Sequence, residues 1–481
     1  MTRECQCSAS EACVHTFEFD GRHYAFNGNS MMLAEVSAEG RSELEGAGPS
    51  QRSDADDDIG QKAEPGAQRA AESLRGQLHG VGFFRPRADA TRVRELDDAR
   101  IDETLAAVPR PTLVQLSIAG VCNMRCSYCY ANYGAFAGKP GVPFMPVETV
   151  RQSTRLLAGA SSEAVRVGLL GGEPLLHPRI GQVLDAIQEE AAAIKKRVVM
   201  QVDTNGTVVS EEILKGLAAH DVGVSVSWDG PDWVQDAQRP LVRNGASFDM
   251  VRRNVHRLID RLGLERIGIS VTCSPSSVNA IIEFWSHLRR VFGPLRIKVS
   301  PAWVPPGHQC AWTPEATNAW AQVSRELARL EAGFTLAGGV PSDAIERHAV
   351  GGRKIRLSVC AFATTQLAVG VDGVVYPCIA LVGRPEFAMG SVAQGELSRS
   401  ARVADTIAIS SVVRKAQCQS CWAKYLCAGG CPVVALSTGG DASRCTDAVC
   451  DMLRKNAETD LIGFVLLRAR SPLESTRMTA C

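Results

Sequence analysis

The hydrophobic pattern near the N-terminus predicts a small antiparallel sheet. Hydrophobic and polar residues alternate along Val14–Phe19, and the turn residues Asp20-Gly21 follow. A second strand is predicted at His23–Phe26, a second turn at Asn27-Gly28-Asn29, and a third strand at Met31–Val36. Alternation interrupted by such turns is typical of a β-meander. Because three short strands need a surface to pack against, we expect a further element beside them.

The pattern disappears between residues 38 and 72. Leu44 and Ile59 are the only large apolar residues there, and the remainder is mainly Gly, Ala, Ser, Pro, Gln and charged residues. Such a segment cannot bury enough apolar surface to fold. Leu74 and Leu78 then share a helical face. We therefore expect a β-meander at 1–37, a disordered insertion or linker at 38–72, and a helix with a connector at 73–108.

Beyond Pro111 the pattern alternates between strands and helices. The helices are amphipathic, as in Ile180–Ile194 and Phe248–Leu262, and the strand-like runs are Leu113–Ile118, Val165–Leu170, Val198–Val202, Val222–Val226, Ile267–Val271 and Ile297–Val299. Repeated βα units imply parallel strands with helices outside. Because the segment is shorter than the roughly 250 residues of a closed eight-stranded barrel, we expect an α/β fold with a partial (β/α)6 barrel at residues 109–305.

The last third of the chain predicts a different organisation. A helical bridge is expected at 306–355, with its helix at Glu315–Leu330, and a C-terminal helix and tail at 456–481. Residues 356–455 are rich in Cys and Gly and have little regular periodicity. Since such a segment cannot supply a large hydrophobic core, bound metal is a natural substitute.

Composition limits the classes of function. The 481-residue chain is 45% hydrophobic and carries 52 Lys+Arg against 52 Asp+Glu. This balance excludes a disordered tail, a collagen-like fibre and a polybasic nucleic-acid binder. A neutral chain gains little from phosphates or anionic lipids, so we expect no nucleic-acid and no membrane partner. At about 100–200 residues per domain, the length predicts two or three domains.

The 17 cysteines are the compositional outlier. Residues 1–14 contain no apolar signal segment, and no apolar run approaches the roughly 20 residues that span a bilayer. We therefore expect a cytoplasmic protein, in which thiols stay reduced and available for metal. The odd number of cysteines and their tight clustering also favour metal ligation over a disulfide framework.

Three cysteines follow directly on the first strand of the predicted barrel. Cys122, Cys126 and Cys129 form a C-x3-C-x2-C loop at the carboxyl end of the sheet, where α/β folds bind ligands. A structural zinc needs four ligands, and the next cysteine along the chain is Cys273. A zinc site or free thiols remain the alternatives to an iron–sulfur cluster with one open iron.

The loop, with Tyr128 before its last cysteine, resembles that of the radical S-adenosylmethionine (SAM) enzymes. The resemblance extends over Pro111–Pro301 through three strand ends: Gly171-Gly172-Glu173-Pro174, Asp203-Thr204-Asn205-Gly206 and Ser227-Trp228-Asp229-Gly230. It implies a [4Fe–4S] cluster on the three cysteines and bound SAM, with Glu173 on the methionyl amino group. It further implies cofactor contacts from Tyr128, Gly171, Gly172, Glu173, Thr204, Asn205, Ser227 and Asp229.

A second set of cysteines resembles the SPASM extension of these enzymes. Cys360-x12-Gly373-x4-Cys378 precedes Cys418-x2-Cys421-x5-Cys427-x3-Cys431, and Cys445 and Cys450 follow. The resemblance implies one auxiliary [4Fe–4S] cluster on Cys360, Cys378 and Cys431, and another on Cys418, Cys421, Cys427 and Cys450. Cys445 is a second candidate for the closing position, and zinc knuckles are the alternative to clusters.

The other cysteines carry less information. Cys5, Cys7, Cys13 and Cys481 are expected to be unligated. Cys273 should face the same mouth as the loop, although a free Cys is more often a small buried hydrophobe. Cys310 could either face this mouth or be a small buried hydrophobe.

Within SPASM enzymes the chain resembles peptide maturases, especially those that form thioethers. The run Cys129–Gly134 (CYANYG) resembles their continuation of the loop, and His15–Phe19 resembles the start of their leader-peptide recognition module. Ile379 follows Cys378, where sulfatase maturases have an aspartate. The resemblance implies a precursor peptide whose leader adds as an extra strand, and an electron donor such as flavodoxin or ferredoxin.

The implied reaction is cleavage of SAM to a 5′-deoxyadenosyl radical that abstracts a hydrogen from the peptide. No catalytic residue beyond the cluster is assigned. The alternatives are a carbon–carbon cross-link, formylglycine formation, or a non-catalytic metal-binding module that senses redox state or binds a partner.

Overall fold

The main sheet is a curved layer of mostly parallel strands. The structure is a computed structural model that describes residues 13–46, 74–81, 83–86, 89–133, 142–243, 245–337, 355–468 and 479–480. The eight-stranded sheet has the order β11-β10-β4-β5-β6-β7-β8-β9. Its six βα strands are all parallel to one another: β4 (Leu113–Ala119), β5 (Ala164–Gly171), β6 (Arg197–Thr204), β7 (Gly223–Ser227), β8 (Ile267–Cys273) and β9 (Arg296–Pro301). The predicted partial barrel is confirmed.

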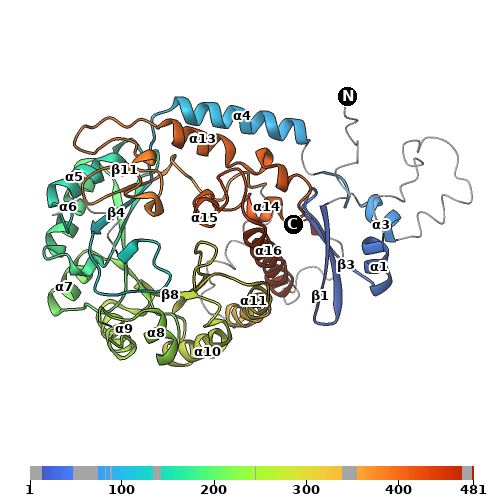
Figure 1. Cartoon of the computed structure of the whole chain (residues 1–481), viewed down its shortest axis with the longest axis horizontal. Coiled ribbons are helices and arrows are strands. Elements are labelled where there is room, and N and C mark those ends of the chain that lie inside the picture. Colours follow the sequence, from blue (N-terminus) through green and yellow to red (C-terminus); the bar gives the residue numbers. More distant parts are fainter. Residues whose placement is uncertain are drawn as a thin grey trace, which may run out of the picture.

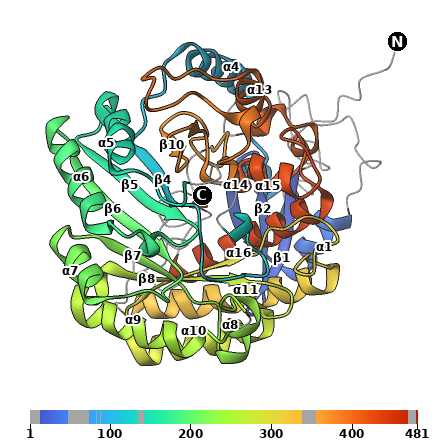
Figure 2. The ribbon, with the colours of Figure 1, turned by 60° about the vertical axis from the view of Figure 1, so that its left-hand side comes forward.

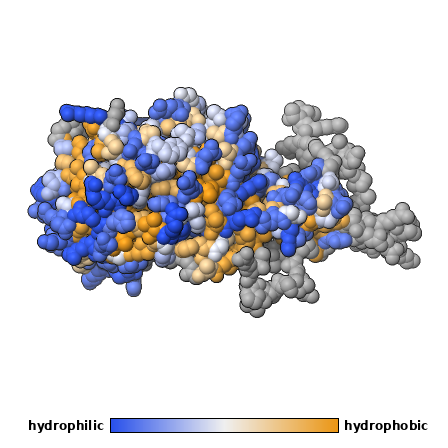
Figure 3. Space-filling model, turned by 90° about the horizontal axis from the view of Figure 1, so that it is seen from below, coloured by the Kyte–Doolittle hydropathy of each residue, from blue (hydrophilic) through white to orange (hydrophobic). Residues whose placement is uncertain are grey.

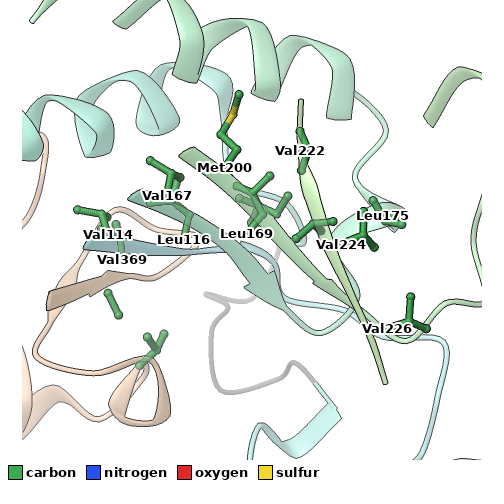
Figure 4. Close-up of a cluster of buried hydrophobic side chains, with 14 of the residues drawn as sticks. Val114, Leu116, Val167, Leu169, Leu175, Met200, Val222, Val224, Val226 and Val369 are labelled. Atoms are coloured by element: carbon green, nitrogen blue, oxygen red, sulfur yellow. The ribbon is translucent and has the colours of Figure 1, made fainter. Parts of the chain in front are cut away.

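Helices cover the outer face of this sheet (Figure 2). They are α5 (Val147–Arg155), α6 (Ile180–Ala193), α7 (Glu211–Ala219), α8 (Asp232–Gln238), α9 (Phe248–Leu262) and α10 (Ile281–Phe292). Val167 and Met200 point from the strands towards these helices (Figure 4), and both are buried. Since buried and half-buried positions alternate along β8, its half-buried residues lie on the opposite face of the sheet.

Two short strands extend the main sheet beyond β4. β10 (Gln366–Val369) pairs in parallel with β4, and β11 (Val375–Tyr376) pairs antiparallel with β10. Both lie in the Cys-rich segment for which the sequence predicted little regular structure. A four-residue strand carries too few positions to show a period, so its pairing could be recognised only in the folded chain.

Two long helices connect the barrel to the rest of the molecule. α11 (Pro314–Leu336) and α16 (Asp447–Arg468) lie side by side (Figure 1), and Trp320 Nε1 donates to Asn456 Oδ1 at 2.7 Å. Shorter or separate helices are α4 (Ala90–Ala106), α13 (Ala401–Ile409), α14 (Lys424–Cys427) and α15 (Pro432–Ser437). Among the described residues, no helix has the length and apolar character that would let it cross a bilayer.

The N-terminal sheet forms as predicted, but with an additional helix. β1 (Val14–Phe19), β2 (Arg22–Asn27) and β3 (Met32–Val36) are antiparallel. α1 (Ala38–Gly46) then occupies the start of the segment expected to be a disordered insertion or linker, so that expectation was wrong for 38–46. Ser37 Oγ accepts a hydrogen bond from Gly40 N at 3.0 Å, and Leu44 packs against the sheet. Residues 47–73 lie outside the described residues.

Both faces of the N-terminal sheet are covered. One face, with Ala25 and Ala34, packs against α1, α3 (Leu74–Gly80) and Phe83. The other face, with Phe17 and Phe26, packs against Val412 to Leu426 and the end of α16. A Cβ added to Gly28 would lie 1.9 Å from the backbone oxygen of Trp422. The sheet therefore shares a core with the Cys-rich region.

A third view shows a surface of mixed character. Polar side chains predominate at the barrel end, and apolar side chains gather towards the middle of the face that Figure 3 presents.

Candidate active site

The three-cysteine loop is fixed to the sheet by backbone contacts. Gly172 N donates to Ala119 O at 2.7 Å, and Glu173 N donates to Val121 O at 2.9 Å. A Cβ on Gly172 would lie 2.1 Å from Val121 O, and one on Gly171 would lie 2.3 Å from Ala119 O. The glycines therefore allow the end of β5 to approach the loop backbone, a role that the sequence did not reveal.

We expect Gly172→Ala to displace the loop, because its new Cβ would overlap backbone atoms that cannot rotate away. The iron content of the loop and the rate of 5′-deoxyadenosine formation should fall at least tenfold. Gly181→Ala is the matched control, since no atom lies within 4 Å of its added Cβ. The control should keep full activity and gain up to about 1 kcal/mol in the free energy of unfolding. Equal activity of both variants would contradict the prediction.

Glu173 connects two of the predicted strand ends. Its buried carboxylate accepts hydrogen bonds from Leu175 N at 3.0 Å, Thr204 Oγ1 at 2.6 Å and Asn205 N at 2.7 Å. Burial raises the pKa of Glu173, and these hydrogen bonds act in the opposite direction. Asn205 Nδ2 donates to Asn123 Oδ1 at 2.9 Å and lies 3.8 Å from Cys122 Sγ. The network thus reaches the loop, while the expected contact of Glu173 with a cofactor stays a prediction.

Asp229 connects two further strands to the same loop. Its carboxylate accepts hydrogen bonds from Thr272 N at 2.9 Å and from the Tyr128 hydroxyl. The pKa of Asp229 is raised by burial. Both carboxylate oxygens are therefore engaged with protein groups, so in this structure Asp229 holds the loop in position.

Arg239 is the residue of this site that the sequence analysis missed. Its Nη1 donates to the Tyr128 hydroxyl at 2.7 Å, and within the described part of the chain its buried Nε has no hydrogen-bond partner. Burial raises the pKa of Cys126, and the Arg239 charge opposes that rise. The arginine therefore favours the thiolate, which is the form that binds metal.

The other residues predicted to contact the cofactor differ in their exposure to solvent. Gly171, Gly172 and Ser227 are half-buried at the ends of their strands, whereas Thr204 and Asn205 are buried.

The pKa of Cys122 is raised by burial to about 11. Tyr130 is 60% exposed overall. Burial first, and then the charges of Cys378 and Cys129, raise its pKa.

The structure brings the C-terminal thiols into two groups. In the first group, burial raises the pKa of Cys378 to about 11, and charges on Cys431 and Cys360 contribute. In the second, burial raises the pKa of Cys418 to about 12, with contributions from Cys427, Cys421 and Cys450. Cys431 thus lies near the distant Cys360. The division of the thiols into two sets of ligands stays a prediction, as does their binding of iron.

Cys445 and Cys450 interact directly. A hydrogen bond between the two thiols raises the pKa of Cys445 and lowers that of Cys450. The Cys445 thiol also lies 3.9 Å from Gly429 O. This arrangement favours Cys450 as the thiolate and Cys445 as a thiol that donates to it.

The thiol groups can be compared with a site for a single ion. Among the described residues, no three His, Cys, Asp or Glu side chains are placed to hold one metal ion. The buried Lys415, beside the second group, also fits an anionic cluster of thiolates.

The other cysteines have separate environments. Cys13 is buried, with its Sγ 3.9 Å from Gln419 O, and Cys273 is buried at the end of β8. Cys310 Sγ lies 3.5 Å from Ser127 Oγ, within the three-cysteine loop. Cys5, Cys7 and Cys481 lie outside the described residues.

Residues 116–275 match the Radical SAM superfamily. The structure of anSMEcpe with bound AdoMet is similar over 75% of this chain and 100% of its own, at 16% identity and a TM-score of 0.61. SuiB from Streptococcus suis bound to S-adenosylmethionine is similar over 91% of this chain and 98% of its own, at 14% identity and a TM-score of 0.53. SuiB bound to the precursor peptide SuiA covers the same shares, at 13% identity and a TM-score of 0.51. At these identities the similarity shows the fold alone.

Proposed function

We propose that this radical SAM enzyme modifies a ribosomally made precursor peptide and that the product is a thioether cross-link. The observation that carries the proposal is the joint presence of the three-cysteine loop, two further thiol groups and an N-terminal sheet with an edge that accepts an extended chain. The similar structures of anSMEcpe and SuiB include complexes with the Cp18Cys peptide and with SuiA. A peptide substrate is therefore the class that the fold supports best.

The residues around the loop have separate tasks in this proposal. When bound, the [4Fe–4S] cluster and SAM supply a 5′-deoxyadenosyl radical that can abstract a hydrogen from an unactivated carbon. Cys122, Cys126 and Cys129 would hold the cluster. Glu173 fixes the ends of β5 and β6, while Asp229 and Arg239 fix Tyr128.

The inner face of the sheet is the proposed place for the peptide. Small residues occupy paired, half-buried positions of β7 and β8: Ser225 opposite Gly268, and Ser227 opposite Ser270. Because these side chains fill little space, an extended segment can lie against the inner face of the sheet. Among the candidate chemistries, the half-buried Ile379 beside Cys378 offers no carboxylate for formylglycine formation.

The two C-terminal thiol groups support the thioether. We propose that Cys360, Cys378 and Cys431 hold one auxiliary cluster, and that Cys418, Cys421, Cys427 and Cys450 hold the other. A [4Fe–4S] cluster held by three thiols would have one iron left to bind the thiolate of a peptide cysteine. We further propose that a flavodoxin or ferredoxin supplies electrons in the cytoplasm, where the thiols stay reduced, and that residues 109–305 and 356–455 are the two catalytic units.

The decisive experiment uses a precursor peptide that contains cysteine. The protein would be reconstituted anaerobically with iron and sulfide and incubated with SAM, a reductant and the peptide, and the products analysed by mass spectrometry. A thioether removes two hydrogen atoms and leaves the cysteine resistant to reduction and alkylation. Loss of two hydrogens with an alkylatable cysteine would indicate a carbon–carbon link instead. Absence of 5′-deoxyadenosine would overturn the enzymatic proposal.

The β3 edge of the N-terminal sheet is the proposed site for the leader. β12 (Thr479–Ala480) pairs there antiparallel with β3, with Thr479 opposite Leu33 and Ala480 opposite Met32. This edge therefore accepts an extended backbone, the mode by which a leader would add as a strand. The rest of β3, from Ala34 to Val36, has no partner on that side within the described residues.

Removing the C-terminal segment should strengthen leader binding. A tethered strand competes at an effective concentration on the order of 1 mM, so a chain ending at Arg468 should bind a leader peptide about threefold to tenfold more tightly. The dissociation constant, measured by fluorescence anisotropy, provides the check. The double substitution Thr479→Pro with Ala480→Pro should have the same effect, because proline has no backbone N–H, whereas Ser at both positions should not. Unchanged affinity in the truncated chain would place the leader elsewhere.

A further inference from the structure

A buried lysine lies among the thiols of the second group. The Lys415 side chain is 0% exposed, and its Nζ donates to Gly429 O at 2.7 Å. Gly429 belongs to the turn between Cys427 and Cys431, and Lys415 O accepts a hydrogen bond from Cys418 N at 2.9 Å. Together with the hydrogen bond from Gln419 Nε2 to Lys415 O at 2.9 Å, these contacts hold the residue within the loop that carries the thiols.

The charge of Lys415 acts on three of the neighbouring thiols. Burial raises the pKa of Cys418, and the Lys415 charge opposes that rise. The same charge opposes the rise in the pKa of Cys445 and contributes to the fall in that of Cys450, in both cases after the larger effects of the hydrogen bond between them and of burial.

No carboxylate neutralises this cation within the described part of the chain. The acceptor at Nζ is a neutral carbonyl. Asp441 is exposed, and it feels the Lys415 charge without forming an ion pair with it. A buried charge is costly unless an opposite charge offsets it. With neutral thiols Lys415 would remain uncompensated, whereas thiolates bound to iron would supply the missing negative charge.

We propose that Lys415 is the buried counter-charge of the second auxiliary site and raises the reduction potential of the cluster held there. Reduction adds one negative charge to a cluster, and a fixed cation close to it favours the reduced state. Charge and hydrogen bonding around a cluster are known determinants of its potential. The inference rests on the proposed assignment of Cys418, Cys421, Cys427 and Cys450 to one cluster.

The test compares Lys415→Met with Lys424→Met in the full-length reconstituted protein. Lys424 is the matched control because its Nζ also donates to a carbonyl of the same loop, Gln419 O at 3.1 Å, while its side chain is half-buried. The readout is a redox titration followed by electron paramagnetic resonance. In Lys415→Met, the reduction potential of one auxiliary signal should fall by at least 59 mV. For a one-electron couple this corresponds to a tenfold change in the ratio of reduced to oxidised cluster. Lys424→Met should leave every signal in place.

Lys415→Gln separates the charge from the hydrogen bond to Gly429 O, because the amide still donates. An unshifted potential in Lys415→Gln with full iron content would overturn the proposal and reduce Lys415 to an anchor of the turn. Loss of iron from the second group alone in Lys415→Gln would support it, since only the charge has been removed. Wild-type protein with about four iron atoms per chain would instead refute the auxiliary clusters themselves, a failure of the proposed function that the iron count reveals before any variant is made.

Discussion

Cys126→Ala should abolish 5′-deoxyadenosine formation while the C-terminal thiols keep their iron. Cys126 lies in the loop fixed by Gly172 and Glu173, whereas the other two groups are built from residues 360–450. The variant should therefore lose about four of twelve iron atoms per chain, the content of one [4Fe–4S] cluster. Chromatography of the nucleoside and an iron assay provide the measurement.

Cys310→Ala is the control for this variant. Its thiol touches the same loop, 3.5 Å from Ser127 Oγ, but belongs to none of the three groups. We expect unchanged iron content and a rate of cofactor cleavage within about twofold of wild type, because a surrounding contact is lost but no ligand. A Cys126→Ala protein that still cleaves SAM at the wild-type rate would show that the loop is not the catalytic site.

Cys421→Ala and Cys431→Ala should each eliminate the modified peptide without stopping cofactor cleavage. The two residues lie ten positions apart in the chain but in different thiol groups. Each substitution removes a ligand from a small module whose folding energy includes metal binding, so each should lower the thermal midpoint and the iron content by about one cluster. Mass spectrometry of the co-incubated peptide would reveal the missing product.

Cys13→Ala is the matched control for Cys421→Ala. Cys13 is buried beside the second group, and its pKa, raised mainly by burial, is raised further by Cys421. Since we assign it no iron, the variant should form product normally and retain all clusters. A normal product yield from Cys421→Ala and Cys431→Ala would mean that the C-terminal groups only stabilise the fold, and the proposed thioether chemistry would lose its basis.

The N-terminal sheet and the second thiol group form one packed unit. The His15 ring stacks on Trp422 with centroids 3.9 Å apart and planes inclined by 5°, and His15 Nε2 lies 2.7 Å from Glu458 Oε2. Phe17 and Phe26 share a core with Val412 and Cys418. The sheet that carries the proposed leader edge therefore packs directly against a proposed auxiliary site. In the sequence these elements are separated by nearly 400 residues, and no local pattern marks their contact.

Local patterns of the sequence determined the regular elements and the motifs. Each of the six predicted βα strands occurs, because a buried strand is a short apolar run bounded by turns. The helices at Ile180–Ala193 and Phe248–Leu262 also occur, because their apolar residues recur at the helical period. The cysteine spacings are equally local, since ligands of one site are supplied by a few tight turns.

Only the tertiary structure decided what depends on distant partners. α1 forms where composition predicted a linker, because Leu44 finds a sheet to pack against. β10 pairs with β4 across some 250 residues of sequence. Arg239 and Lys415 read as ordinary charged residues until the fold buries them beside Tyr128 and Gly429. The burial of a charged side chain and the charges that compensate it depend on all the elements packed around it. No single segment of the sequence contains that information.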